Sequence, residues 1–219
     1  DPARGAREAI LEQRGREAFL DTQAKYGHDQ AQFGIVQGGT YEDLRKQSAK
    51  YITDLDFEGI AIGGLSVGEP TEMMYEMTDL NTNYLPENKP RYLMGVGKPH
   101  NLLHCIARGI DMFDCVLPTR NARNGQIFTP NGYINISNAK WKNHNQPLDP
   151  DFPSDLCQKY KMSYIHHLFR NDELLGLSLA SLHNLIFYIS LMNEVKDRIA
   201  NNTFHNWYQG KADMLDTKI

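Results

Sequence analysis

Two stretches, Phe33-Gly34-Ile35-Val36-Gln37 and Gly59-Ile60-Ala61-Ile62-Gly63, decide the fold of this chain. Each is a short apolar run, rich in β-branched residues, that ends at a glycine or a polar residue. Residues 41–55, between them, carry the pattern of an amphipathic helix. The order strand, helix, strand predicts a βαβ unit with two parallel strands.

The same alternation continues to about residue 116. Further strands are expected over residues 91–95 and 112–116, further helices over residues 71–84 and 99–109, and a charged helix over residues 6–26. Repeated units of this kind predict an α/β fold on a parallel sheet, either a doubly wound sheet or a (β/α)8 TIM barrel. Four such units are only half of a barrel.

The alternation stops after Pro118, where we place a boundary between a domain of residues 1–118 and a domain of residues 119–219. Residues 119–160 are rich in Asn, Pro, Asp and Lys and hold only short apolar pieces such as residues 132–136. This composition predicts an inserted subdomain. Three helical segments are expected to follow it.

The charge of the whole chain excludes one class of function. With 27 acidic and 23 basic residues, the formal net charge is −4, which argues against indiscriminate binding of polyanions. Any contact with nucleic acid must come from a local group of Arg and Lys. The three cysteines, Cys105, Cys115 and Cys157, are widely spaced and odd in number, which favours a reducing cytoplasm over a disulfide framework.

The longest apolar stretch, near residues 185–192, is far shorter than the about 20 residues that a membrane span needs, so no membrane partner is expected. The chain shows no charged-then-apolar leader. It begins with Asp1 and enters a helical pattern directly, from which we expect an N-terminal part to be missing.

Glycines and polar residues follow the end of each predicted strand. These groups are Gln37-Gly38-Gly39, Gly63-Gly64-Leu65-Ser66, Gly95-Val96-Gly97-Lys98 and Asp114-Cys115. In a barrel they would converge on the face that carries active sites. A carboxylate such as Asp114 could there attack an anomeric carbon and form a covalent glycosyl intermediate. An acidic cap, or a partner for a nearby Arg, is the structural alternative.

Residues 109–125, GIDMFDCVLPTRNARNG, carry a resemblance to a known family. They resemble the nucleophile motif of the tRNA-guanine transglycosylases, also called queuine tRNA-ribosyltransferases, in their bacterial form. The likeness extends to residues 33–39, 59–69, 92–98 and 164–184. It implies that this chain is the C-terminal portion of such a protein, with the second half of a TIM barrel and a helical subdomain that binds zinc in relatives.

The resemblance implies an enzyme that exchanges guanine at the anticodon wobble position of tRNA for 7-aminomethyl-7-deazaguanine, in queuosine biosynthesis. Asp114 would be its nucleophile and would form a covalent bond to ribose. A second carboxylate protonates the departing base and deprotonates the incoming one. The family draws it from an early barrel strand, to which nothing in this chain corresponds.

Five residues match base-binding positions of the family: Gln37, Gly64, Leu65, Glu69 and Met94. The Gln37 amide both donates and accepts hydrogen bonds, Gly64 lets the backbone approach a ligand, and Met94 offers a flat, polarizable surface. The structural alternatives are a turn-stabilising role for Gln37, an ordinary βα turn at Gly64, a place in a first helical turn for Glu69 and core packing for Met94. Val67, where eukaryotic members tend to carry Gly, favours the smaller base.

The family also implies an RNA-binding group beside the nucleophile. Its residues are Gly95, Val96, Gly97, Lys98, Thr119, Arg120, Asn121, Ala122 and Arg123. The expected partner is the anticodon loop of tRNA, whose unpaired bases cost little to extrude. Arg and Lys of this group would contact its phosphates, whereas a solvated charged face is the alternative.

The zinc site of the family is only half present. Cys157 and His183 stand at matching positions, whereas Phe152 and Ser154 replace the first two cysteines. A structural zinc needs four protein ligands, and Phe cannot coordinate. Asp155, His166 and His167 lack the expected spacing to substitute, so we predict that zinc is not bound.

Two rival functions remain open. One is a noncatalytic subunit of the same family that binds tRNA or a catalytic partner. The other is a glycosidase on a similar barrel, for which the paired carboxylates at strand ends are lacking. The family implies a homodimer formed through the C-terminal subdomain, with Trp141, Tyr164 and His167 as aromatic candidates; internal packing is their alternative.

Overall fold

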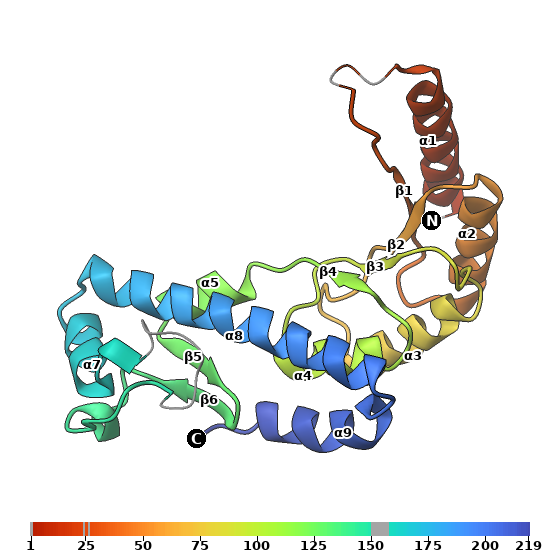
Figure 1. Ribbon diagram of the computed structural model, residues 1–219. Helices are drawn as coiled ribbons and strands as arrows, with labels where there is room; N and C mark the ends of the chain where they lie inside the picture. The colour runs from red at the N-terminus through yellow and green to blue at the C-terminus, as the bar shows by residue number, and fades with distance from the viewer. Residues whose placement is uncertain (1, 24, 26, 150–157) are drawn as a thin grey trace. The chain divides into compact units, whose positions relative to one another are not determined.

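The computed structural model describes residues 2–23, 25, 27–149 and 158–219 (Figure 1). The chain divides into two compact units. One holds the residues up to Val96 together with His104–Cys115, and the other holds Gly97–Leu103 together with Val116–Ile219. The boundary expected after Pro118 falls inside a helix, α5 (Leu117–Arg123).

The first unit is built on a four-stranded parallel sheet. Its strands are β1 (Phe33–Val36), β2 (Gly59–Ile62), β3 (Arg91–Leu93) and β4 (Met112–Phe113), paired in the order β1-β2-β3-β4. Before and between them along the chain run the helices α1 (Pro2–Asp21), α2 (Glu42–Asp54), α3 (Thr71–Thr82) and α4 (Pro99–Ile106), of which α4 belongs to the first unit only from His104 onward. This order confirms the predicted α/β alternation and the parallel sheet.

Burial explains why the first two strands could be predicted from the sequence. All four residues of β2 are buried, as in a parallel strand that is covered on both faces. Helix α2 buries Arg45, Ala49 and Ile52, which lie on one helical face. Strands β3 and β4 end earlier than predicted, and the N–H of Gly95 donates to the Asp114 carboxylate rather than to a neighbouring strand.

The second unit combines a hairpin with helices. The antiparallel strands are β5 (Gln126–Thr129) and β6 (Gly132–Asn135). The helical elements are α5, the 3-10 turn η1 (Ala139–Trp141), α7 (Met162–Arg170), α8 (Leu174–Ala200) and α9 (Phe204–Leu215). The three C-terminal helices were predicted; α5 and the two hairpin strands were not.

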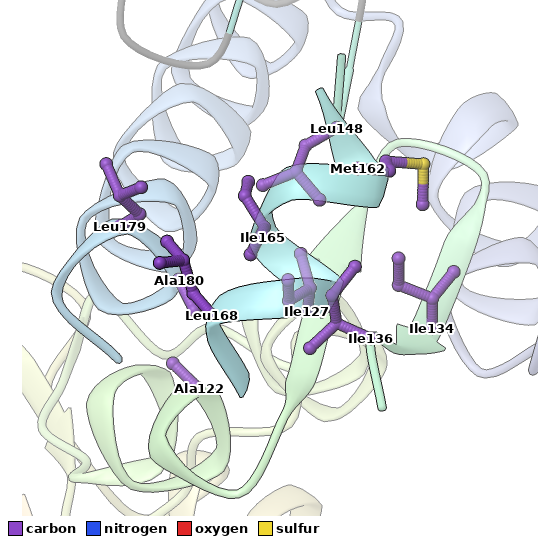
Figure 2. Close-up of a cluster of buried hydrophobic side chains, with 10 residues drawn as sticks. All are labelled: Ala122, Ile127, Ile134, Ile136, Leu148, Met162, Ile165, Leu168, Leu179 and Ala180. Atoms are coloured by element: carbon purple, nitrogen blue, oxygen red, sulfur yellow. The ribbon is translucent and has the colours of Figure 1, made fainter. Parts of the chain in front are cut away.

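A hydrophobic cluster holds the second unit together, as Figure 2 shows. It takes side chains from α5, both hairpin strands, α7 and α8. Its buried members are Ala122, Ile127, Ile134, Ile136, Leu148, Met162, Ile165, Leu168, Leu179 and Ala180. The cluster explains why a segment poor in apolar residues folds, because few but well-placed residues meet the apolar face of α8.

Asn184 of α8 ties α5 and β5 to that helix. Its side chain is fully buried; the amide nitrogen donates to the Pro118 and Gln126 carbonyls at 2.9 and 3.0 Å, and the amide oxygen accepts from the Phe128 N–H at 3.0 Å. A buried amide with all these partners satisfies backbone groups that would otherwise lose their hydrogen bonds.

Helix α8 is long and apolar enough, among the described residues, to cross a membrane by length and composition alone. The sequence-based expectation that no segment meets this criterion was therefore wrong. The core helix of a soluble protein meets it equally, and eight α8 residues, including His183 and Asn184, are buried in the second unit.

Candidate active site

The carboxylate of Asp114, directly after the last sheet strand, is held by two donors of the neighbouring strand β3 and its turn. The Tyr92 hydroxyl donates to its Oδ1 at 2.6 Å, and the Gly95 N–H donates to the same oxygen at 2.9 Å. Because Tyr92 is paired with Met112 across β3 and β4, the sheet register brings these groups together. The carboxylate is thus oriented, while Asp114 itself stays exposed.

These contacts set the charge of the carboxylate. The hydrogen bond from Tyr92, followed by that from Gly95, lowers the pKa of Asp114 below its ordinary value. In return, the bond to Asp114, together with burial, raises the pKa of Tyr92 to about 12. At neutral pH the pair therefore consists of an ionised carboxylate and a neutral phenol, which suits a nucleophile.

Tyr92 was not among the predicted site residues. The sequence places it inside a strand, where an aromatic side chain is ordinarily explained by packing. A usable signal was its position two residues before Met94, because alternate residues of a strand share a face. The register between β3 and β4 decided its partner, and no sequence pattern gives that register.

The first two strands bring the predicted base-binding residues Gln37 and Gly64 into contact. A methyl group placed on Gly64 would lie 2.8 Å from the Gln37 Oε1, and one on Gly63 would lie 2.9 Å from its Nε2. The Gln37 amide therefore lies along the glycine pair that follows β2. Gly64 has a φ of +67°, in the left-handed region that favours glycine.

Glu69 closes the loop after β2. Its carboxylate accepts hydrogen bonds from the backbone N–H groups of Ser66 and Val67, the latter at 3.0 Å. Burial raises the pKa of Glu69, but hydrogen bonds from backbone N–H groups, first its own and then those of Ser66, Val67 and Gly68, outweigh burial and leave the pKa below the ordinary value. Ser66 has a φ of +60°, an unusual conformation for a residue with a side chain, and the Glu69 contacts hold it there.

Two of the remaining base-binding predictions concern apolar residues. Met94 is half-buried. Leu65 is only 3% exposed, so its side chain belongs to the core and only its backbone can face a ligand.

The predicted RNA-binding residues fall in both units. Gly95 and Val96 belong to the first, and Gly97, Lys98 and residues 119–123 belong to the second. Arg120 and Arg123 are exposed, three residues apart on α5.

Several residues of the predicted RNA-binding group have buried side chains. Val96 is 1% exposed and Ala122 is fully buried in the hydrophobic cluster, so both side chains pack internally. Gly97 is buried, and its carbonyl accepts the Tyr188 hydroxyl at 2.5 Å. The helical period of α5 explains Ala122, because a residue between Arg120 and Arg123 lies on another face of the helix.

The side chains of Thr119 and Asn121 also have partners inside the second unit. The Thr119 hydroxyl donates to the Val116 carbonyl at 3.3 Å, and the Asn121 amide nitrogen donates to the Gln126 Oε1 at 2.9 Å. Both residues are half-buried.

Of the two predicted metal ligands, only His183 lies among the described residues. Cys157, with the Phe152 and Ser154 positions, lies outside the described residues. His183 is buried, its Nε2 lies 2.9 Å from the Phe128 carbonyl, and burial lowers its pKa, so the ring is neutral and donates from Nε2. Within the described residues, no three His, Cys, Asp or Glu side chains gather as a metal site would require.

The fold and the site define an α/β protein with an oriented, ionised carboxylate and a glycine-lined amide at the carboxyl end of one parallel sheet. The sequence profile described as "Queuine tRNA-ribosyltransferase" matches residues 7–216 of this chain. The chain therefore belongs to the queuine tRNA-ribosyltransferase family.

Individual relatives agree with this assignment. A queuine tRNA-ribosyltransferase of Rickettsia bellii is 52% identical over 187 residues, which cover 85% of this chain and 50% of the relative. One of Herpetosiphon aurantiacus is 51% identical over 199 residues, covering 91% of this chain and 51% of the relative. One of Thermoanaerobacter pseudethanolicus is 51% identical over 187 residues, covering 85% and 48%. The chain spans about half the length of these relatives.

Proposed function

We propose that the protein containing this chain exchanges guanine at the wobble position of a tRNA anticodon for 7-aminomethyl-7-deazaguanine, with Asp114 as nucleophile. The observation that carries the proposal is the carboxylate itself. Two donors, from Tyr92 and Gly95, keep it ionised and fix its orientation. Membership of the family and the names of the relatives support the same reaction.

The proposed reaction has two displacements at one carbon. In the first, an Asp114 oxygen forms a bond to the ribose C1′ while the bond from C1′ to guanine breaks, and the departing base takes up a proton. In the second, the incoming base loses a proton and attacks C1′, and the ester to Asp114 breaks. Two displacements retain the configuration at C1′. The proton donor and acceptor is expected from an early barrel strand, to which nothing in this chain corresponds.

Gln37 and the loop after β2 are proposed to bind the base. The Gln37 amide offers a donor and an acceptor to the edge of a purine, and Gly64 leaves room for close approach. Glu69 holds the backbone of Ser66 and Val67, and this backbone would face the aminomethyl substituent.

The anticodon loop is the proposed RNA partner, held through phosphates by Lys98, Arg120 and Arg123. Neither arginine side chain has an ion-pair partner among the described residues, so both charges are available to an anion. This local group supplies the positive charge that the acidic chain lacks overall.

The wider architecture is proposed from the strand order and the family. Four parallel strands in sequential order fit a segment of a (β/α)8 barrel, whereas a doubly wound sheet reverses its order at a switch point. We further propose a homodimer, a cytoplasmic location without membrane contact, and a second unit that folds without zinc, because Phe152 and Ser154 cannot complete a zinc site.

The decisive experiment follows labelled guanine into tRNA. Protein expressed from its complete natural reading frame is expected to incorporate label, and Asp114→Asn is expected to abolish both incorporation and the covalent RNA adduct. Asp111→Asn is a matched control, because the Asp111 carboxylate likewise accepts a β3 N–H, that of Arg91, at 2.8 Å. Equal incorporation by wild type and Asp114→Asn would refute the nucleophile.

A noncatalytic role as a tRNA-binding or dimer-partner subunit is not favoured. Such a subunit has no need of an ionised carboxylate held by two donors, and the relatives carry the name of the enzyme. The same incorporation assay separates the two roles, since a noncatalytic subunit binds tRNA without exchanging its base.

A further inference from the structure

Arg45 of α2 is a fully buried arginine whose guanidinium is bonded to backbone rather than to a carboxylate. Its side chain is 0% exposed. The Nη1 donates to the Gly63 carbonyl at 2.8 Å and to the Val36 carbonyl at 3.3 Å, the Nη2 to the Gly64 carbonyl at 3.2 Å, and the Nε to the Gly39 carbonyl at 2.7 Å. One side chain thus joins the loops that follow β1 and β2.

The bonds to Gly63 and Gly64 fix the direction of two N–H groups. In a trans peptide the N–H points opposite to the C=O. The Gly63 carbonyl shares a peptide with the Gly64 N–H, and the Gly64 carbonyl shares one with the Leu65 N–H. Because both carbonyls point to the buried guanidinium, both N–H groups point away from it; Gly64 is exposed, whereas Leu65 is buried.

These two N–H groups have no acceptor among the described residues. Gly64 is exposed, so its N–H is open to a ligand. The unused Gly64 N–H beside the Gln37 amide is an arrangement that an acceptor atom of a purine can use.

A second residue of α2 completes the support. The Ser48 hydroxyl oxygen accepts the backbone N–H of Gln37 at 3.0 Å. Ser48 lies three residues after Arg45, on the same side of the helix. Helix α2 therefore holds Gln37 by its backbone and the Gly64 loop by its carbonyls.

We propose that Arg45 is a positioning residue for base exchange, which presents the Gly64 N–H group and the Gln37 amide to the base. This assignment rests on the proposed function. Lysine cannot replace Arg45 in this role, because a single ammonium group cannot reach all the carbonyls to which the planar guanidinium donates. Burial lowers the pKa of Arg45 to about 10, with the nearby Glu69 charge acting in the opposite direction, so the guanidinium stays charged at neutral pH.

The test separates the Michaelis constant for the base from that for tRNA. Arg45→Lys is expected to raise KM for guanine on the order of 10²-fold, since misplacement by about 1 Å has effects of that size, while KM for tRNA keeps its wild-type value. A merely structural defect would lower kcat through the active fraction and leave both constants unchanged.

Arg91→Lys is the matched control. The Arg91 guanidinium also donates to two carbonyls, of Pro86 at 3.2 Å and Leu85 at 2.6 Å, but at the amino end of β3. It is expected to leave KM for guanine unchanged. Amide hydrogen exchange is a second readout: Arg45→Lys should speed exchange in the loops after β1 and β2, and Arg91→Lys should not.

Should Arg45→Lys fail to fold, Ser48→Ala takes its place, with a smaller rise in KM for guanine and again no change for tRNA. An unchanged KM for guanine in a folded Arg45→Lys or in Ser48→Ala, with wild type active, overturns the role of α2 alone. Wild type without incorporation overturns the proposed function and this assignment with it.

Discussion

The contact between Gly64 and Gln37 predicts that a single methyl group at position 64 will weaken base binding. Gly64→Ala places its Cβ 2.8 Å from the Gln37 Oε1, closer than real Cβ contacts come. That oxygen is the far end of a flexible side chain, so it moves at little cost in stability. The left-handed φ of +67° adds about 1–2 kcal/mol of backbone strain for a residue with a Cβ.

Gly39→Ala provides a matched control with the same strain but without the clash. Gly39 has a φ of +56°, and a methyl group there would find its nearest atom, in the Tyr41 ring, at 3.9 Å. Both variants are therefore expected to lose about 1–2 kcal/mol of unfolding free energy. At about 2–4 °C per kcal/mol, their Tm values should fall by similar amounts.

Only Gly64→Ala should weaken binding of the base. Displacing the Gln37 amide removes two hydrogen bonds of about 0.5–1.5 kcal/mol each. A loss of about 1–3 kcal/mol corresponds to a rise in KM for guanine of about 5- to 150-fold. The assay is steady-state incorporation of labelled guanine beside a thermal melt. If Gly39→Ala raises KM as much as Gly64→Ala, or Gly64→Ala leaves it unchanged, the reasoning from this contact is wrong.

Two further predictions test the nucleophile and the second unit. Tyr92→Phe removes the hydrogen bond that most lowers the pKa of Asp114. The pKa of Asp114 then rises, so the carboxylate becomes protonated at a higher pH. The acidic limb of the profile of kcat against pH should therefore move to higher pH. A limb that stays in place would contradict the role of Tyr92. Asn184→Leu leaves two carbonyls and one N–H without their buried partner, and should lower the unfolding free energy by about 3–5 kcal/mol. Denaturant unfolding measures it, and a loss below about 1 kcal/mol would show that these groups find other partners.

The sheet was predictable because its strands are chemically uniform. Strands β1 and β2 bury β-branched residues between glycines, and the helix between them has a clear apolar face. Helix α5 was missed because its sequence, LPTRNAR, has no apolar period. It forms where Pro118 suits a first helical turn and where the amide nitrogen of Asn184, 66 residues later, donates a hydrogen bond to the Pro118 carbonyl.

The candidate site was predictable in its residues but not in their support. Asp114, Gln37 and Gly64 follow strand ends, which the period of the sequence locates. Tyr92 depends on the register of β3 against β4, and Arg45 would be expected on the solvent face of a helix, since charged residues are rarely buried. Residues 119–123 were predicted as RNA-binding together because they match one segment of the family. That group includes Ala122, whose side chain packs in the hydrophobic cluster.

The nucleophile and the base-binding loops are supported by separate sets of hydrogen bonds. Tyr92 and Gly95 hold Asp114 from β3 and the turn after it, whereas Arg45 and Ser48 hold the loops after β1 and β2 from α2. The two sets share no residue, so energetic effects at one set should add to those at the other. Under the proposed function, such a division would let the base pocket change its preference among 7-substituted bases without disturbing the charge on the Asp114 carboxylate.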